Sequence, residues 1–164
     1  MDATFPAAVV QEAGQRGPEA LAAERGGILP WCGPAAIALA AGCSYAEACA
    51  LLRRVAPQRY PAGEIVTAYW RDVMAALAEA GLAATRLPLA EPRPTLIGLA
   101  RRHGLSAGLY LVRVTGHFLL LRHHGFGLAE VHDNKLAGAV LSPRSHGLCR
   151  VTHVARLSPA DAAA

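Results

Sequence analysis

The hydrophobic pattern of this chain changes its period near residue 104, and that change limits the folds the chain can adopt. Before this point, apolar residues lie in alanine- and leucine-rich stretches bounded by Pro, Gly and capping residues, such as PEALAAER and YAEACALLRR. After it, short apolar segments such as GLYLVRV and HFLLLRH are separated by turn residues. Helices followed by antiparallel strands form an α+β fold.

The boundaries of the expected elements follow from local signals. Ser44 and Glu47 form a capping box, and Pro34 and Gly42 mark the start and end of an apolar helix. Helices are expected over 18–25, from about 32 to 41, and over 45–54, 64–81 and 95–104. Strands are expected over 84–89, 108–114, 117–123, 127–133, 136–141 and 149–157.

The length of 164 residues suits one domain. We expect a single domain over 1–164, with its core at about 18–157 and a frayed tail at 158–164.

Composition and charge argue against several classes of protein. The sequence has no uncharged apolar run of about 18 residues and no basic start followed by an apolar block, so we expect no membrane span, no secretion signal and a cytoplasmic location. The net charge of +4 comes from dispersed arginines, and Lys135 is the sole lysine. We therefore expect solvated arginines and no nucleic-acid partner. The sequence gives no indication of oligomeric state.

Cys32 is the cysteine with a chemical reason to be reactive. The four cysteines, at 32, 43, 49 and 149, form no CxxC pair, so we interpret them as free thiols. Cys32 falls at a helix N-terminus, where unpaired amides favour a thiolate and where its own amide can donate to an oxyanion. The alternative is that Cys32 is a small buried hydrophobic residue.

His117 and Asp133 are candidates for the base and its orienting group. His117 opens a strand after the Thr115–Gly116 turn, and Asp133 ends the next strand, so a hairpin would bring them level. Asn134 is the fallback if the register shifts. The alternatives are an exposed turn histidine and an Asx turn at Asp133.

These residues carry a resemblance to a known family. CGPAAIALAAGCSYAEACALL and GLYLVRVTGHFLLLRHHGFGLAEVHDN resemble the papain-like cysteine peptidase superfamily. They are most similar to its C39-like, bacteriocin-leader peptidase branch and to related small proteins of bacteria and phages. The resemblance covers about residues 28–134. It implies a papain-like fold, with an N-terminal helical half packed on a C-terminal antiparallel sheet, and a catalytic triad of Cys32, His117 and Asp133.

The chain departs from that family at the oxyanion hole. The family has a glutamine about six residues before the cysteine, where this chain has Gly26, and Gln15 is too distant by spacing. Trp31 and Gly116 are candidate substrate-binding residues, with core packing as the other interpretation of Trp31.

Four hypotheses follow. The first is a cysteine peptidase or amidase acting on a peptide or isopeptide bond through a thioester, with no cofactor. The others are an acyltransferase with the same triad, a degenerate papain-like module that binds a partner, and a metal site. Residues for the last are numerous near the C-terminus but lack local ligand spacing: His123, His124, His132, His146, His153 and Cys149.

Overall fold

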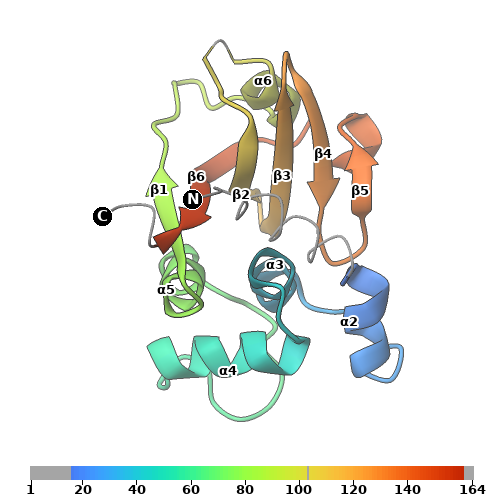
Figure 1. Cartoon of the computed structure of the whole chain (residues 1–164), viewed down its shortest axis with the longest axis vertical. Helices are drawn as coiled ribbons and strands as arrows, with labels where there is room; N and C mark the ends of the chain where they lie inside the picture. The colour runs from blue at the N-terminus through green and yellow to red at the C-terminus, as the bar shows by residue number, and fades with distance from the viewer. Residues whose placement is uncertain (1–15, 103, 161–164) are drawn as a thin grey trace, which may run out of the picture.

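The computed structural model describes residues 16–102 and 104–160, and it confirms an α+β fold. Helices α2 to α5 lie together in one half of the molecule and the sheet forms the other half (Figure 1). The helices of the described ranges are α2 (Pro18–Glu24), α3 (Cys32–Ala41), α4 (Tyr45–Val55), α5 (Trp70–Glu79) and α6 (Leu96–Ala100). A short 3-10 turn, η1 (Pro143–Ser145), precedes the last strand.

The six strands form one antiparallel sheet. They are β1 (Leu82–Arg86), β2 (Gly108–Val114), β3 (His117–Gly125), β4 (Leu128–His132), β5 (Ala137–Val140) and β6 (Val151–Pro159). Their order is β1-β6-β2-β3-β4-β5. Strands β2 to β5 form a meander as expected, and β6 returns to lie between β1 and β2.

Both faces of the central strands are buried, which explains their continuous apolar runs. Leu111 and Leu120 are paired in register and belong to the core cluster that contains α3, α4 and α5. Val112 and Leu119 are paired one position along and belong to the opposite cluster, with α6. Successive side chains of a strand alternate between faces. The sheet is therefore covered by helices on both sides.

The start of α3 is held in place by the loop that precedes α5. A Cβ atom built on Gly33 would lie 2.5 Å from the Cβ of Ala68, so only glycine permits this approach. Gly42 ends α3 with φ of 67°, and the capping box of Ser44 and Glu47 starts α4, both as the sequence predicts. Local signals thus fix the bounds of α3 and the start of α4.

The helix predicted over 64–81 is wrong in its first part, because α5 begins at Trp70. The preceding residues are extended: Ile65 is buried, Ala68 lies against Gly33, and the backbone N–H of Tyr69 donates to the Tyr60 hydroxyl at 3.1 Å. These tertiary contacts outweigh the helical period of the segment.

Several further boundaries differ from expectation, among them the end of α6, which is Ala100 and not residue 104. Strand β1 begins at Leu82, two residues before the predicted strand. Strand β6 continues to Pro159, and the Ala160 N–H donates to the Gly81 carbonyl, so the predicted frayed tail is wrong for 158–160. Residues 161–164 lie outside the described residues.

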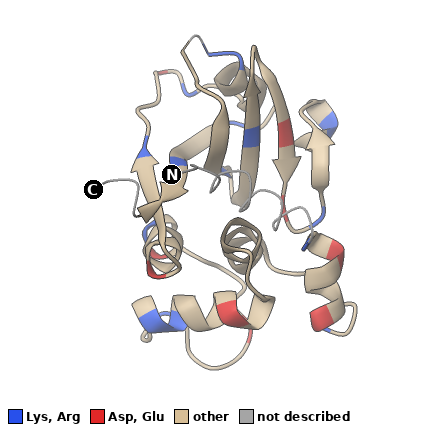
Figure 2. Cartoon of the chain, viewed as in Figure 1, with Lys and Arg blue, Asp and Glu red and all other residues tan. Residues whose placement is uncertain are grey.

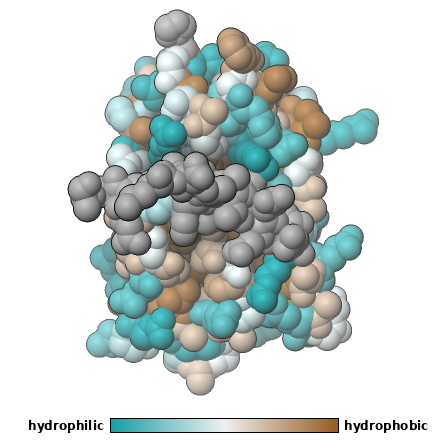
Figure 3. Space-filling model, viewed as in Figure 1, coloured by the Kyte–Doolittle hydropathy of each residue, from teal (hydrophilic) through white to brown (hydrophobic). Residues whose placement is uncertain are grey.

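The distribution of charge agrees with dispersed arginines. Basic and acidic residues are scattered over both halves of the molecule (Figure 2). Hydrophilic residues alternate with smaller apolar areas on the face shown in Figure 3. Within the described residues, no single helix has the length and apolar character to cross a bilayer, although α3 and α4 meet those criteria as a pair bent by 106°.

Candidate active site

Cys32 is the first residue of α3, as the sequence predicts. The helix has no side-chain cap, since Trp31 occupies the N-cap position in an extended conformation. The His117 side chain and the backbone N–H groups of Phe118 and Cys32 lie close enough to the Cys32 thiol to lower its pKa. The sulfur therefore lies at a junction between the helical half and β3.

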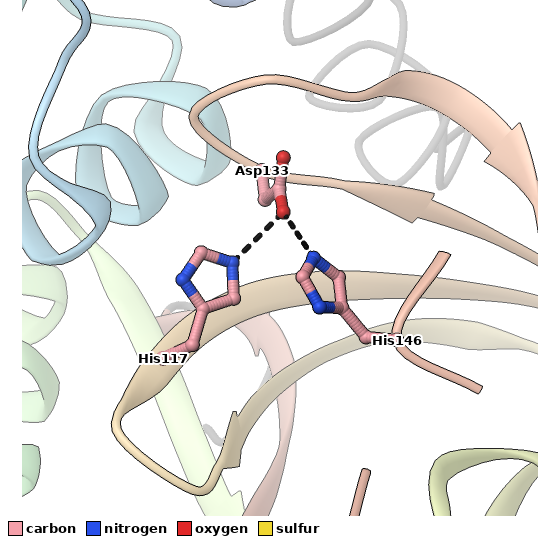
Figure 4. Close-up of side chains that lie close together, drawn as sticks. All are labelled: His117, Asp133 and His146. Atoms are coloured by element: carbon pink, nitrogen blue, oxygen red, sulfur yellow. Dashed lines mark hydrogen bonds and ion pairs between the residues drawn. The ribbon is translucent and has the colours of Figure 1, made fainter. Parts of the chain in front are cut away.

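His117 and Asp133 form the second half of the arrangement. The Nε2 atom of His117 lies 2.8 Å from Oδ2 of Asp133, and Asp133 is 1% exposed (Figure 4). Since Nε2 is used by the carboxylate, Nδ1 is the ring nitrogen left for Cys32. An orienting carboxylate of this kind sets the tautomer and the plane of an imidazole.

The antiparallel register explains how Asp133 reaches the start of β3. Leu120 pairs with His132, so the residue after His132 continues toward the beginning of the strand where His117 lies. The other carboxylate oxygen of Asp133, Oδ1, accepts from the backbone N–H groups of Lys135 and Leu136, both at 2.7 Å. The Asx turn and the contact with His117, which the sequence presents as alternatives, occur together.

The ionisation of these three groups is coupled. Burial alone raises the pKa of the Cys32 thiol, but the hydrogen bonds from His117 and Phe118 more than offset it, so the pKa lies below its ordinary value. Burial lowers the pKa of His117, and its bonds to Asp133 and Cys32 reverse this and raise the pKa to about 9. Burial raises the pKa of Asp133, while His117 and the two backbone donors lower it far below its usual range.

Two of the other cysteines behave in the opposite way. Burial raises the pKa of Cys43 to about 11, with a smaller contribution from the Glu47 charge. Burial likewise raises the pKa of Cys49, inside α4. All four cysteines are free thiols. Cys32 therefore differs from these two in its electrostatic surroundings and not in its redox state.

The remaining predicted site residues lie close to this arrangement. Trp31 is 36% exposed and its indole N–H lies 3.3 Å from a carboxylate oxygen of Glu64, so the interpretation as a core residue is wrong. Gly116 lies in the β2–β3 turn beside His117, with φ of 71°. Asn134 does not replace Asp133: its side-chain amide donates to the Pro30 carbonyl at 2.8 Å and ties the aspartate loop to the loop before Cys32.

The oxyanion donors are incomplete by comparison with the expected pattern. The Cys32 amide is one donor at the helix start. Gly26 stands in the turn after α2 with φ of 68° and has no side chain to contribute. Gln15 lies outside the described residues.

His146 is a residue of the site that the sequence analysis missed in this role. Its Nε2 atom lies 2.8 Å from the same Oδ2 of Asp133, and its ring centroid lies 4.6 Å from that of His117. Figure 4 shows both rings directed at one carboxylate oxygen. His146 follows the η1 turn in a left-handed conformation with φ of 66°. No pattern in the sequence links it to Asp133, 13 positions away.

Part of this cluster could also hold a metal ion. Among residues 16–102 and 104–160, one group of ligand atoms could hold a metal ion, formed by His117, Asp133 and His146 with all three atoms within 4.8 Å of one another. Imidazole and carboxylate ligands suit divalent transition metals. Such an ion would occupy the same face of His117 that Asp133 now contacts.

The other predicted metal ligands do not converge. His123 is buried with Nε2 2.7 Å from the Ala100 carbonyl, and its Nδ1 accepts from the Gly125 N–H at 3.2 Å, so its hydrogen bonds are satisfied within the fold. His153 stacks on Trp70. His124 of β3 and His132 of β4 both lie near Oε2 of Glu130, with Nε2 atoms 3.4 and 3.8 Å away, and do not join the group of His117, Asp133 and His146.

Comparisons with known proteins add no identity to this geometry. The chain matches no protein-family model, no curated protein and no solved structure. The site must therefore be interpreted from its own chemistry, as a thiol, an imidazole and a buried carboxylate in one hydrogen-bonded series.

Proposed function

We propose that this chain is a papain-like cysteine hydrolase that cleaves a peptide or isopeptide bond. The observations that carry the proposal are the His117 side chain beside the Cys32 thiol, whose pKa it lowers, and the 2.8 Å contact between His117 and Asp133. A nucleophile, a base and an orienting group in that order are the parts required for acyl transfer through a covalent intermediate.

Each residue has one step in the proposed reaction. The Cys32 thiolate attacks the substrate carbonyl while the Cys32 amide donates to the oxyanion. Protonated His117 gives its proton to the leaving amine, which leaves a thioester on Cys32. His117 then accepts a proton from water, the resulting hydroxide attacks the thioester, and the acid product departs as the Cys32 thiolate and protonated His117 are restored. Asp133 holds the His117 ring with Nδ1 toward sulfur throughout.

Alkylation by iodoacetamide tests the nucleophile without any knowledge of the substrate. At pH 6.5 we expect Cys32 to be carboxamidomethylated faster than Cys43 and Cys49, whose thiols have raised pKa values. Mapping the modified peptides by mass spectrometry measures the three rates in one sample. Equal rates at all three positions would contradict an activated Cys32.

The matched variant for this test is His117→Gln. It removes the imidazole that stabilises the thiolate and leaves Cys43 and Cys49 in their surroundings. We expect the Cys32 rate to fall to the level of the other two. Hydrolysis of a peptide library by the wild-type protein, lost in Cys32→Ala, would then complete the case for a peptidase.

A catalytically degenerate module that binds a peptide partner is the second candidate. The observation that favours it is Gly26 at the position where the papain-like pattern has glutamine. Reactive Cys32 together with no turnover of any peptide in the library would favour this candidate over the hydrolase.

A further inference from the structure

A row of residues connects the proposed nucleophile to a basic region on the face of the sheet that α3, α4 and α5 cover. In the sheet register, Arg113 of β2 pairs with Phe118 of β3 on one side and with His153 of β6 on the other. Residues paired in this way project from the same face. The backbone N–H of Phe118 is among the groups close enough to the Cys32 thiol to lower its pKa, so the row begins beside that sulfur.

Trp70, at the start of α5, packs on this row and keeps an unpartnered donor. Its ring stacks on Phe118 with centroids 6.2 Å apart and on His153 with centroids 4.9 Å apart. Trp70 is 7% exposed, and its indole N–H is buried without a hydrogen-bond partner among the described residues. A buried donor without an acceptor costs free energy, so this indole N–H is an exception among the buried polar groups of the fold.

An open pocket lies in front of Trp70. Its volume is about 340 Å³ and its walls are Tyr69, Trp70, Arg71, Arg86, Arg113 and His153. These six side chains include three guanidinium groups and no carboxylate. A neighbouring pocket of about 310 Å³ shares Trp70, Arg86 and His153 and adds Arg93 together with Glu91, whose carboxylate lies 3.6 Å from that arginine.

Of the three arginines of this pocket, Arg71 alone has an ion-pair partner in the described part of the chain, so most of the positive charge is not neutralised there. The Nε atom of Arg113 is buried without a partner there, and Arg86 forms no ion pair there. The carboxylate nearest to Arg71 is 3.7 Å away, on Asp72, and is already bound by Arg59 at 2.5 Å. Burial lowers the pKa of His153, and the arginine charges lower it further.

We propose that this pocket binds a carboxylate of the peptide substrate and so gives the hydrolase a preference for acidic peptides. The inference rests on the proposed function for the identity of the ligand as a peptide. Guanidinium groups match carboxylates through paired hydrogen bonds. The rings of Tyr69 and Trp70 can cover the apolar stem of the group that carries the charge.

Two sources of this carboxylate are distinguished by three short peptides. The first is Ac-Ala-Ala-Glu-Ala-NH2, the second replaces Glu by Gln, and the third is Ac-Ala-Ala-Ala-Ala with a free C-terminus. Binding is measured to the Cys32→Ala/Trp31→Phe protein, in which Trp70 is the sole tryptophan and reports binding by its fluorescence. All titrations use one ionic strength, because salt screens exposed charges.

We expect one of the two charged peptides to bind roughly 10- to 100-fold more tightly than the Gln peptide, which is the range that charge-assisted hydrogen bonds provide. Preference for the Glu peptide identifies an acidic side chain, and preference for the free C-terminus identifies a terminal carboxylate. Equal affinity for all three peptides would overturn the proposal.

Arginine variants place the binding site. Arg86→Gln and Arg113→Gln are expected to reduce affinity for the preferred peptide by roughly tenfold, with no change for the Gln peptide. Arg101→Gln, at an exposed position after α6, is the matched control and should change nothing. Arg113 lies over the Phe118 ring, so Arg86→Gln is the variant that decides if Arg113→Gln fails to fold. Unchanged affinity in Arg86→Gln would overturn the proposal.

Failure of this inference and failure of the proposed function have different signatures. Charge-dependent binding to Cys32→Ala without hydrolysis by wild type would refute the hydrolase and keep the pocket. Hydrolysis by wild type with equal kcat/KM for acidic and neutral peptides, unchanged by Arg86→Gln, would refute the pocket and keep the hydrolase.

Discussion

Two buried aspartates in this protein are stabilised by different kinds of partner. Asp72, at 3% exposure, accepts two hydrogen bonds from Arg59, at 2.8 and 2.5 Å, and one from the Tyr60 hydroxyl at 2.6 Å. Asp133, at 1% exposure, instead accepts from two backbone N–H groups and contacts the rings of His117 and His146.

The difference lies in what the partner can do. A guanidinium does not titrate in the accessible pH range, so the Arg59–Asp72 pair is permanent and acts as a structural tie between the loop after α4 and the start of α5. An imidazole gains and loses a proton near neutral pH, so the Asp133 cluster can participate in proton transfer. Burial alone does not show whether a carboxylate has a structural role or takes part in proton transfer. The titration behaviour of its partners distinguishes the two roles.

Asp133→Asn should produce the largest effect on activity. Both oxygens of Asp133 accept two donors each, so an amide must turn its NH2 group either toward the backbone N–H groups or toward the histidines. An NH2 group facing His117 makes Nε2 an acceptor and puts the ring proton on Nδ1, where it cannot take a proton from Cys32. We expect kcat/KM to fall roughly 10³- to 10⁴-fold, the scale of a wrong tautomer in a triad.

The measurement is kcat/KM on a peptide cleaved by the wild type, with folding checked by circular dichroism. Asp72→Asn is the matched control and should retain activity per folded molecule. An equal loss of activity in both variants would remove the distinction between the two aspartates.

Local signals in the sequence predict most of the arrangement of Cys32, His117 and Asp133. Cys32 at a helix start and His117 beside a turn glycine are each determined by residues within a few positions. The hairpin register needs one further assumption, that adjacent strands pair, and it leads to Asp133. The insertion of β6 between β1 and β2 has no local signal, because a strand's neighbours depend on the whole fold.

The parts that were not predicted are those assembled from distant segments. His146 is the left-handed residue that follows the short η1 turn, and from that position its ring contacts Asp133. The basic pocket takes Arg71 from α5, Arg86 from β1 and Arg113 from β2, which appear in the sequence as dispersed charges. Scattered arginines in a sequence therefore do not exclude a concentrated site in the fold.

Asp72→Asn should produce the largest effect on stability. It keeps the shape of the side chain but removes the charge that balances Arg59, whose side chain is 37% exposed and can turn partly to water. We expect a loss of about 2 to 3 kcal/mol in the free energy of unfolding, less than for a fully buried pair. Urea denaturation followed by circular dichroism measures it. A loss under about 0.5 kcal/mol, the level of an ordinary surface substitution, would show that the tie is not structural.

Above about pH 6.5, the pH dependence of stability should come from the pair of His117 with Asp133 and not from Asp72. Partnership with Asp133 raises the folded-state pKa of His117 above its unfolded value of 6.5, so its contribution is complete below about pH 6.5 and is lost as pH rises toward the folded pKa. The lowered pKa of Asp72, set by Arg59, gives a contribution that is lost only at acid pH.

The Cys32→Ala background isolates this effect, because the Cys32 thiol titrates in the opposite sense. Between pH 6.5 and pH 8 we expect the free energy of unfolding to fall on the order of 1 kcal/mol in Cys32→Ala. The fall should vanish in Cys32→Ala/Asp133→Asn and persist in Cys32→Ala/Asp72→Asn. A fall that vanished with Asp72→Asn instead would reverse the roles given to the two aspartates.

His146 offers the finest comparison, since it shares the Asp133 oxygen with His117 but is not bonded to the thiol. His146→Ala leaves Asp133 with His117 and both backbone donors, so we expect kcat/KM to fall only about threefold, equivalent to part of one hydrogen bond. His146→Gln keeps an N–H donor on a side chain of similar reach and should recover most of that loss. A merely packing role for the ring would not be rescued in this way. A loss as large as that in Asp133→Asn would instead make His146 part of the proton-transfer machinery, because the carboxylate would then depend on both rings to hold the working geometry.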